Sequence, residues 1–338
     1  MNYDAILVTS FGGPESTEDV MPFLENVLRG KNVPRERMLA VAEHYYHFGG
    51  RSPINDQNRR LIAALEAELA EHGPHLPVYW GNRNWHPMLA DTVRQMKSDG
   101  VRRALAFVTS AYSSYSSCRQ YREDIARAQS AAGEGAPIVD KIRAFHNHPG
   151  FIEAVVDRVR QALAELPEKR RAGAQLIYTA HSIPLGMAQH CDYEVQLEET
   201  GRLVADALGH KEWRLVYQSR SGPASQPWLG PDILDCLRTV RAQSASADVV
   251  IAPLGFVSDH MEILFDLDTQ ARELCAELGL NMVRAGTAGT HPRFIRMIRE
   301  LICERIDGNT ARLALGSLGP RPDVCAIDCC PMPTRPAT

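Results

Sequence analysis

The sequence predicts an α/β protein with two lobes, each a parallel sheet covered by helices, and a short tail rich in cysteine. Short apolar strands alternate with amphipathic helices along the 338 residues, a pattern typical of parallel sheets. The segment HNHPG, residues 146–150, separates two such series, and the polar tail contains DVCAIDCCPMP. We therefore predict lobes at 1–145 and 146–316 and a tail at 317–338.

The strands are predicted where β-branched or aromatic residues gather and a Gly, Ser or Asn follows. Six segments meet this description: 5–10, 78–82, 104–111, 176–182, 214–219 and 249–257. Helices are predicted where apolar residues recur every four positions. Leu61, Leu65 and Leu69 do so before Gly73, and a second such series runs from Phe151 to Leu163, before Pro167.

Composition excludes several classes. A formal charge of -4 gives no reason to expect nucleic-acid binding. Asp4 stands where a signal peptide would be basic, and no apolar run reaches the ~18 residues of a membrane span, so we expect a cytoplasmic protein without a membrane span. The glycine motifs of nicotinamide dehydrogenases, nucleotide hydrolases and serine hydrolases are absent.

His181 is the first candidate site residue, because the apolar strand in LIYTAHSIP runs straight into it. Ligands of such sheets bind beyond the carboxyl ends of the strands, and a histidine there can accept a proton or bind a metal. A loop histidine that only bonds to backbone is an equally good reading of its position.

Carboxylates gather after a second strand, in GFVSDHMEILFDLDTQ. Glu262, Asp266 and Gln270 are spaced by four, so a helix would align them on one face. Clustered carboxylates can take protons or hold a divalent cation. A solvated helix face is the usual alternative, but Asp259 and His260 directly follow a buried strand.

A hydroxyl- and ring-rich segment, SAYSSYSSCRQY, follows a third strand and suits a flat ligand with polar edges. Tyr45 and Ser52 lie near a Gly pair in YYHFGGRSPIN, and Arg29 and Lys31 supply cations for anionic groups. A plain surface loop remains the alternative for these segments.

The tail cysteines Cys325, Cys329 and Cys330 raise a separate question. A bridge between the adjacent Cys329 and Cys330 would be strained, and a cytoplasmic setting disfavours disulfides, so a metal is the better reading. Three thiolates leave one ligand short of the four that a two-iron cluster or a structural zinc takes. Idle surface thiols are a lesser alternative.

Five motifs together resemble the ferrochelatases, which insert ferrous iron into a porphyrin in haem synthesis. They are LVTSFGGP, FGGRSP, TAHSIP, QSRSGP with PWLGPD, and GFVSDHMEIL, and the match covers almost the whole chain. The resemblance implies the chelatase fold: two doubly wound, Rossmann-like lobes with four-stranded parallel sheets around a porphyrin cleft.

The resemblance also implies roles for the residues above. His181 and Glu262 would face each other across the macrocycle and bind the incoming Fe2+, and His181 or Glu262 would accept the pyrrole protons. Asp266 would continue a proton or metal path, although relatives often have longer acids at Asp266 and Gln270. Residues expected to contact the porphyrin are Phe11, Arg29, Tyr45, Ser52 and Tyr121; Phe11 stands where some relatives have Tyr, and a phenyl ring cannot ligate iron.

The tail is similar to that of actinobacterial coproporphyrin III ferrochelatases that carry a 2Fe-2S cluster. By that resemblance Cys118 joins Cys325, Cys329 and Cys330 as ligands, with Cys191 in reserve. We expect coproporphyrin III and ferrous iron as substrates, a monomer, and a downstream haem-pathway enzyme as a partner. The alternatives are a protoporphyrin IX ferrochelatase, a cobalt or nickel chelatase for a related tetrapyrrole, and a non-enzymatic haem or iron-sulfur carrier.

Overall fold

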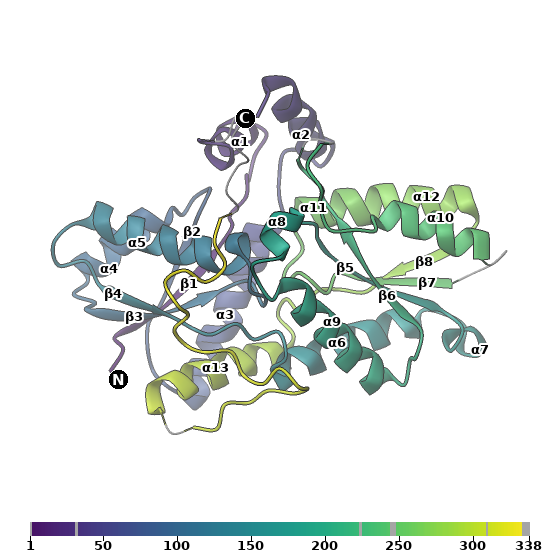
Figure 1. The fold of residues 1–338 in the computed structure, drawn as a ribbon. Coiled ribbons are helices and arrows are strands. Elements are labelled where there is room, and N and C mark those ends of the chain that lie inside the picture. Colours follow the sequence, from purple (N-terminus) through teal and green to yellow (C-terminus); the bar gives the residue numbers. More distant parts are fainter. Residues whose placement is uncertain (1, 31–32, 223–224, 244–247, 309, 333–338) are drawn as a thin grey trace.

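Two parallel four-stranded sheets form the framework of the protein (Figure 1). The computed structural model describes residues 2–30, 33–222, 225–243, 248–308 and 310–332. Lys31, one of the expected cations, lies outside these residues. The α/β class and the two parallel sheets predicted from the sequence are confirmed.

The sheet of the N-terminal half has the order β2-β1-β3-β4. Its strands are β1 (Ala5–Ser10), β2 (Val78–Asn82), β3 (Arg103–Val108) and β4 (Ile138–Lys141). The central strand β1 pairs with β2 and β3, and all six of its residues are buried. Helices therefore cover both faces, as burial of a parallel sheet requires.

The sheet of the C-terminal half repeats this order as β6-β5-β7-β8. Its strands are β5 (Gln175–His181), β6 (Trp213–Gln218), β7 (Asp248–Ala252) and β8 (Asn281–Arg284). Strand by strand, β5 takes the place of β1 and β7 the place of β3. The carboxyl ends of both sets of strands carry the segments singled out in the sequence.

The edge strands β4 and β8 were not among the six predicted segments. Each has only four residues, IVDK and NMVR, and each is partly exposed, so neither produces a long apolar run. Strand β7 ends at Ala252 and β3 at Val108, earlier than predicted, because the apolar residues that follow them belong to buried loops.

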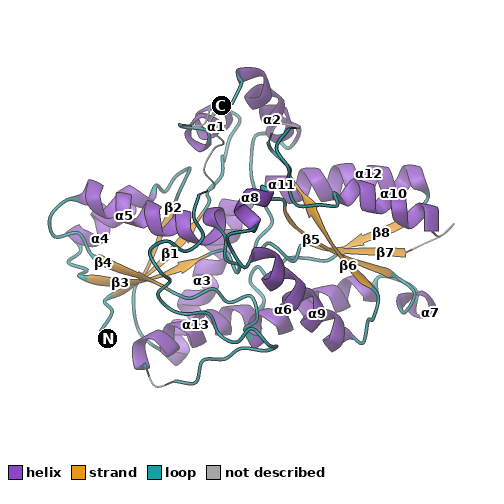
Figure 2. Cartoon of the chain, viewed as in Figure 1, coloured by secondary structure: helices purple, strands orange, loops and turns teal. Residues whose placement is uncertain are grey.

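Thirteen α-helical segments and two π-helical turns connect the strands within the described residues (Figure 2). Those of the N-terminal half are α1 (Val20–Val27), α2 (Arg35–His47), α3 (Ile54–His72), α4 (Leu89–Ser98), η1 (Tyr115–Arg119) and α5 (Gln120–Ala132). Those of the C-terminal half are α6 (Pro149–Ala164), α7 (Glu168–Arg171), α8 (Leu185–Ala188), α9 (Tyr193–Leu208), α10 (Ile233–Gln243), α11 (Met261–Ile263), η2 (Leu264–Ala271), α12 (Arg272–Leu278) and α13 (Pro292–Asp307).

Both helices predicted from four-residue spacing are present. Helix α3 buries Leu61, Leu65 and Leu69 and ends at Gly73, whose φ of 65° suits a residue without a Cβ. Helix α6 begins at Pro149, which needs no N–H partner in the first turn, and His148 caps it by accepting the N–H of Gly150.

The two halves share one apolar core. Phe107 and Phe145 of the first half contact Phe294 of the second, and Phe145 also contacts Phe151, with ring centroids 5.7–6.3 Å apart. Helix α13 packs against both α3 and α6, and α10 and α12 cover the opposite face of the second sheet from α6 and α9 (Figure 2). The predicted boundary between residues 145 and 146 falls inside this core and stays a prediction.

Helices α1 and α2 stand together above the two sheets (Figure 1). They are held by a small core of their own, which includes Phe23, Leu24 and Met38. Among the described residues, no helix is long and apolar enough to cross a membrane.

The described part of the tail, up to residue 332, crosses the front of the molecule without helix or strand (Figure 1). Glu199 of α9 accepts the backbone N–H of Ser317 at 2.7 Å and of Leu318 at 2.9 Å. Asn147 donates to the carbonyls of Leu315 and Gly319. Buried polar side chains of the second half, rather than apolar packing alone, therefore hold this part of the tail.

Candidate active site

Three strand ends of the second sheet converge on the candidate site. His181 is the last residue of β5, Gln218 is the last residue of β6, and β7 is followed by the loop that leads into α11 and η2. Carboxyl ends of neighbouring parallel strands share one sheet edge, which explains why motifs distant in sequence meet here.

His181 and Glu262 lie directly opposite each other. Nε2 of His181 is 3.6 Å from Oε1 of Glu262, while Nδ1 donates to the carbonyl of Ser182. Burial would lower the pKa of His181, but the facing carboxylate and the carbonyl of Ser182 raise it to about 9. Burial would raise the pKa of Glu262, but His181 lowers it to about 2. The pair thus holds one proton, mainly on the imidazole.

The relative placement of His181 and Glu262 differs from the expected one. A separation of 3.6 Å leaves no room for a macrocycle between the two side chains, which the resemblance had placed on opposite sides of the ring. Both residues belong to the second half of the chain, on β5 and α11, and this common origin brings them to one side.

Asp266 lies next to this pair. Burial raises the pKa of its carboxyl to about 6, against the hydrogen bond that Ser219 Oγ donates to it. Gln218 Nε2 donates to the same carboxylate and to the carbonyl of Glu262, at 3.3 Å in both cases. Ser219 has a φ of 62°, a strained conformation for a residue with a Cβ.

The acidic segment forms a helix, as the spacing predicts, but of an unexpected kind. After the three residues of α11 it widens into the π-helix η2, which contains Asp266 and Asp268, while Gln270 is exposed. His260 caps α11 by accepting the N–H of Glu262 on Nδ1. π-Helical turns are rare in proteins, and those that do occur are often found at functional sites.

The first half of the chain contributes rings to the same region. Tyr45 of α2 packs 5.7 Å from Phe23, and its pKa is raised by burial and by the negative charge of Glu262. Phe11, directly after β1, is 37% exposed and also contacts Phe23. Tyr45 therefore lies close enough to Glu262 to sense its charge.

Arg83 connects Phe11 to the segment that carries Tyr121. Its guanidinium carbon lies 5.7 Å from the Phe11 ring and 4.5 Å from the Tyr121 ring, and Nε is 2.6 Å from Asp124. Tyr121 is itself buried, so it contacts Arg83 rather than an open surface. Arg83 lies outside every motif considered in the sequence, so residue patterns could not identify it.

Ser52 and Arg29 occupy contrasting positions. Ser52 is buried at the start of α3, where its Oγ accepts the N–H of Ile54 and a Cβ at Gly13 would lie only 2.7 Å from its own Cβ. The close approach explains why position 13 has no side chain. Arg29 is exposed, just beyond the end of α1.

Three further residues support the site from behind. Tyr193 donates to the carbonyl of His181 at 3.1 Å, Gln57 of α3 accepts the N–H of Asp259 at 2.9 Å, and Arg284 pairs with Asp259. Each comes from an element remote in sequence, so residue spacing could not have identified it.

All eight cysteines are free thiols. The four expected ligands lie close enough to influence one another's pKa values or charges. Cys118, buried on η1, is hydrogen-bonded to Cys325 and close to Lys141, and its pKa is lowered to about 5. Burial and the nearby charges of Cys118 and Cys329 raise the pKa of Cys330 to about 12. Within the described part of the chain, no group of three or more His, Cys, Asp or Glu residues is arranged to hold a metal ion.

Two arginines hold the tail cysteines in place. Arg119 donates to the carbonyl of Cys329 at 3.0 Å, and Arg122 donates to those of Ala326 and Ile327. Because both follow Cys118 on η1 and α5, the tail is fixed directly over the internal thiol.

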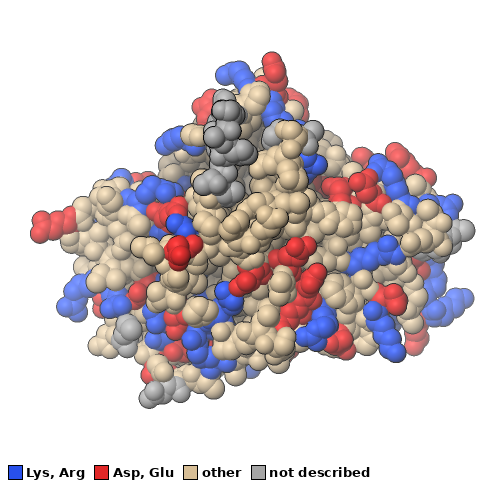
Figure 3. Space-filling view, viewed as in Figure 1, with Lys and Arg blue, Asp and Glu red and all other residues tan. Residues whose placement is uncertain are grey.

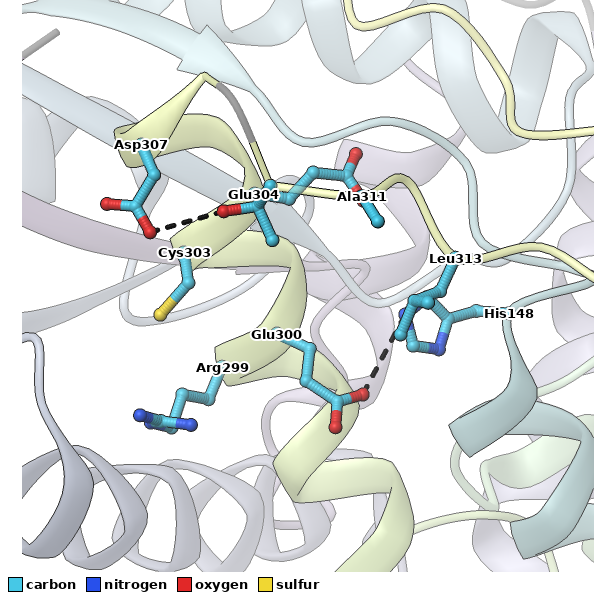
Figure 4. A pocket seen from close by; sticks show the side chains of 9 residues that line it. His148, Arg299, Glu300, Cys303, Glu304, Asp307, Ala311 and Leu313 are labelled. Carbon is cyan, nitrogen blue, oxygen red and sulfur yellow. Dashed lines mark hydrogen bonds and ion pairs between the residues drawn. The ribbon is translucent and has the colours of Figure 1, made fainter.

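A separate pocket of about 330 Å³ lies beside α13 (Figure 4). Buried His148 faces Glu300 across 3.8 Å, and burial and Arg143 lower the pKa of His148 to about 3. The pocket contains none of the expected site residues; it is lined by His148, Arg299, Glu300, Cys303, Glu304, Asp307, Thr310, Ala311 and Leu313. On the face drawn in Figure 3, acidic and basic side chains are interspersed.

Comparisons with known proteins bear on the family and the fold of the chain. The model of the family described as Ferrochelatase matches residues 3–306. A protein of Rhodopirellula baltica named ferrochelatase is 60% identical, covering 97% of this chain and 93% of its own. A coproporphyrin III ferrochelatase of Streptomyces griseus is 51% identical with the same coverage. The structure of SirB from Bacillus subtilis with Fe3+ is similar in fold, with a TM-score of 0.57 at 12% identity over 91% of this chain and 98% of its own.

Proposed function

The chain belongs to the ferrochelatase family and is a metal chelatase, and we propose that it inserts Fe(II) into coproporphyrin III to form coproheme III. The proposal rests on the 3.6 Å distance between His181 Nε2 and Glu262 Oε1. This geometry places a nitrogen ligand and an oxygen ligand side by side, next to the carboxylate of Asp266, which can accept a proton. The choice of porphyrin is supported by relatives from Streptomyces griseus and Streptomyces coelicolor, both named coproporphyrin III ferrochelatases.

Iron insertion exchanges one Fe2+ for the two protons on the pyrrole nitrogens. We assign His181 and Glu262 to one face of the ring, where they meet the incoming iron. Because the imidazole of His181 holds a proton at neutral pH, that proton must leave before Nε2 can bind iron. It and the two pyrrole protons pass through the carboxylates of Glu262 and Asp266 to solvent, and the carboxyl of Asp266, with a pKa of about 6, is ionised at neutral pH. Ser219 and Gln218 hold that carboxylate beside Glu262 through their hydrogen bonds.

The porphyrin-binding residues divide by exposure. Phe11, with an exposed ring, and Arg29, an exposed cation, suit direct contact with the macrocycle and its carboxylates. Tyr45 would close the cleft from α2, near Glu262. Ser52 and Tyr121 are buried, so they would shape the wall from behind, Tyr121 through Arg83.

We also propose a 2Fe-2S cluster held by Cys118, Cys325, Cys329 and Cys330. The pKa of Cys118 is lowered beside Cys325 and Lys141, whereas negative neighbouring cysteines raise the pKa values of Cys325 and Cys330, so the sulfurs lie close enough together that the positive charge of bound iron would be needed to make all of them thiolates. A two-iron cluster divides four thiolates between two metals, so it does not need three sulfurs around one ion, as a structural zinc would. The cluster would fix the tail to η1, and it takes no part in the iron-insertion steps above.

Three further properties complete the proposal: a cytoplasmic location, a monomeric state, and transfer of the product to a downstream enzyme of haem synthesis.

A substrate comparison tests the proposed function. Anaerobic protein is given Fe2+ with coproporphyrin III or protoporphyrin IX, and kcat/KM should be much higher for coproporphyrin III. Equal values or a reversed preference would overturn the choice of porphyrin. Parallel reactions of Co2+ and Ni2+ with sirohydrochlorin test the rival chelatase, and failure to metallate any tetrapyrrole would favour a carrier.

A further inference from the structure

A single arginine contacts both sides of the acidic segment at the active site. Arg284 is the last residue of β8, and its Nε donates to Asp268 Oδ1 at 2.7 Å. Nη1 and Nη2 donate to the two carboxylate oxygens of Asp259, at 3.2 and 3.3 Å. Asp259 precedes Glu262 in the sequence and Asp268 follows Asp266, so the contacts enclose both acids.

The three charged groups are largely shielded from water. Their side chains are 16%, 18% and 23% exposed for Arg284, Asp259 and Asp268 respectively. A forked guanidinium that binds one carboxylate through two nitrogens and a second through the third has a fixed geometry. We call this arrangement of Arg284, Asp259 and Asp268 the Arg284 clasp.

The clasp acts on Glu262 through short connections. Asp259 is followed by His260, which accepts the N–H of Glu262 on its ring nitrogen. The N–H of Asp259 donates to Gln57 of α3, so the same point is tied to the other half of the protein. A shift of Asp259 would therefore move the start of α11 and with it the Glu262 carboxylate.

The clasp also acts on the turn that carries Asp266. A π-helix has wider turns than an α-helix and is rarely stable without support. Because Asp259 and Asp268 are both bound to Arg284, the distance that the nine-residue step between them must span is fixed. Relaxation of η2 to α-helix would rotate Asp266 away from Ser219.

We propose that Arg284 is a positioning residue for iron insertion, holding Glu262 and Asp266 in their orientation toward His181. The proposal rests on the proposed function, because it assumes that these three groups perform the metal and proton exchange. Arg284 contacts neither His181 nor Glu262 itself in the described hydrogen bonds and ion pairs.

The test compares Arg284→Gln and Arg284→Lys with the wild-type protein and with Arg272→Gln. Arg272 is the matched control because, among the described residues, its one ion pair is with Asp268, at 3.5 Å, and its side chain is 52% exposed. We expect kcat for coproporphyrin III and Fe2+ to fall about 10- to 100-fold in Arg284→Gln. Lysine keeps the charge but cannot bridge both carboxylates, so Arg284→Lys should also be impaired, while Arg272→Gln stays within about twofold of wild type.

A neutralised variant separates positioning from stability. Arg284→Gln alone leaves two shielded carboxylates without a cation, which also lowers Tm. Adding Asp259→Asn and Asp268→Asn removes those charges, so Tm should recover while kcat stays low, because amides do not reproduce the forked contact. The porphyrin Kd, measured by fluorescence quenching, should change less than threefold throughout.

Recovery of kcat together with Tm in the neutralised variant would show a stability role and overturn the proposal. Unchanged kcat in Arg284→Gln or Arg284→Lys would overturn it as well, and if Arg284→Gln does not fold, the other two variants decide. If the wild-type protein is active and the variants are unimpaired, only the positioning role of Arg284 is refuted. If the wild-type protein metallates no porphyrin, the proposed function is refuted and the positioning role with it.

Discussion

The two halves of the molecule place different chemistry at the same position of the same fold. In each half a π-helical turn follows the third strand along the chain: η1 comes after β3, and η2 comes after β7. A side chain caps each segment, Ser114 accepting the N–H of Ser117 and His260 that of Glu262. Yet η1 presents a thiol, and the segment of η2 presents carboxylates.

The two π-helical turns differ in how far their functional side chains are exposed, and this explains their different chemistry. Cys118 is 7% exposed beneath the tail, which Arg119 and Arg122 hold in place. Glu262 has a side chain that is 45% exposed and faces His181. A covered thiol site suits a structural group, whereas an open pair of ligands can exchange metal and protons with a substrate. The fold thus provides two equivalent positions, and the surrounding residues decide their use.

The largest effect is expected at the open site. His181→Ala should lower iron insertion by more than about 1,000-fold while leaving the porphyrin Kd within threefold, because it removes a group used in the transition state more than in binding. Turnover and porphyrin affinity are measured side by side. His190→Ala, which alters an exposed histidine after α8, is the control, and near-normal turnover of His181→Ala would refute the assignment.

Changes at the thiol site around Cys118 should alter the visible spectrum of the protein rather than the iron-insertion reaction. Anaerobically purified protein should be red-brown, with iron and acid-labile sulfide in equal amounts, and Cys118→Ser, Cys325→Ser, Cys329→Ser or Cys330→Ser should each bleach or destabilise it. Cys303→Ser on α13 is the control and should keep the visible spectrum. Colourless protein that contains zinc, or a Cys118→Ser protein with its full spectrum, would contradict the cluster.

A smaller effect is expected for the second acid of the open site. Asp266→Asn keeps the shape of the side chain but cannot take a proton, so kcat should fall about 10- to 100-fold. Asp235→Asn, on the exposed surface of α10, should have no effect. If Asp266→Asn retains full activity, the proton path from Glu262 lies elsewhere.

The smallest effect concerns Glu199, which binds the tail, and His146, whose Nε2 lies 3.5 Å from the Glu199 carboxylate. Burial lowers the pKa of His146 to about 4, and hydrogen bonds from Ser317 and Leu318 lower the pKa of Glu199 despite its burial. Both pKa values are lower in the folded than in the unfolded protein, so the unfolded state binds more protons and stability falls as pH drops. The His146 contribution should be lost between about pH 6.5 and 4, and that of Glu199 below 4.5.

Thermal unfolding at intervals from pH 7 to 4 measures this dependence. His146→Gln should show a smaller decrease in Tm over the range, by a few degrees, and His190→Gln should follow wild type. Equal decreases in Tm for His146→Gln and wild type would show that His146 does not titrate over this pH range as described.

Much of the fold followed from local pattern. Strand β1 and strand β2 were predicted to the residue, and α3 and α6 followed from apolar residues spaced by four, because burial of one face imposes that period. His181 and Glu262 were identified because one ends a strand and the other follows one, each within a motif of the ferrochelatases. A buried strand and the turn after it are local features, which a sequence records directly.

The tertiary structure alone decided the geometry and support of the site. That His181 and Glu262 lie on one side, 3.6 Å apart, follows from the neighbouring positions of β5 and β7, which no spacing in the chain reveals. The residues that support the site, Arg284, Gln57 and Tyr193, lie 12 to 202 residues from their partners. Long-range contacts arise when the elements pack together, and for that reason the sequence determined where the chemistry resides and packing determined how it is held.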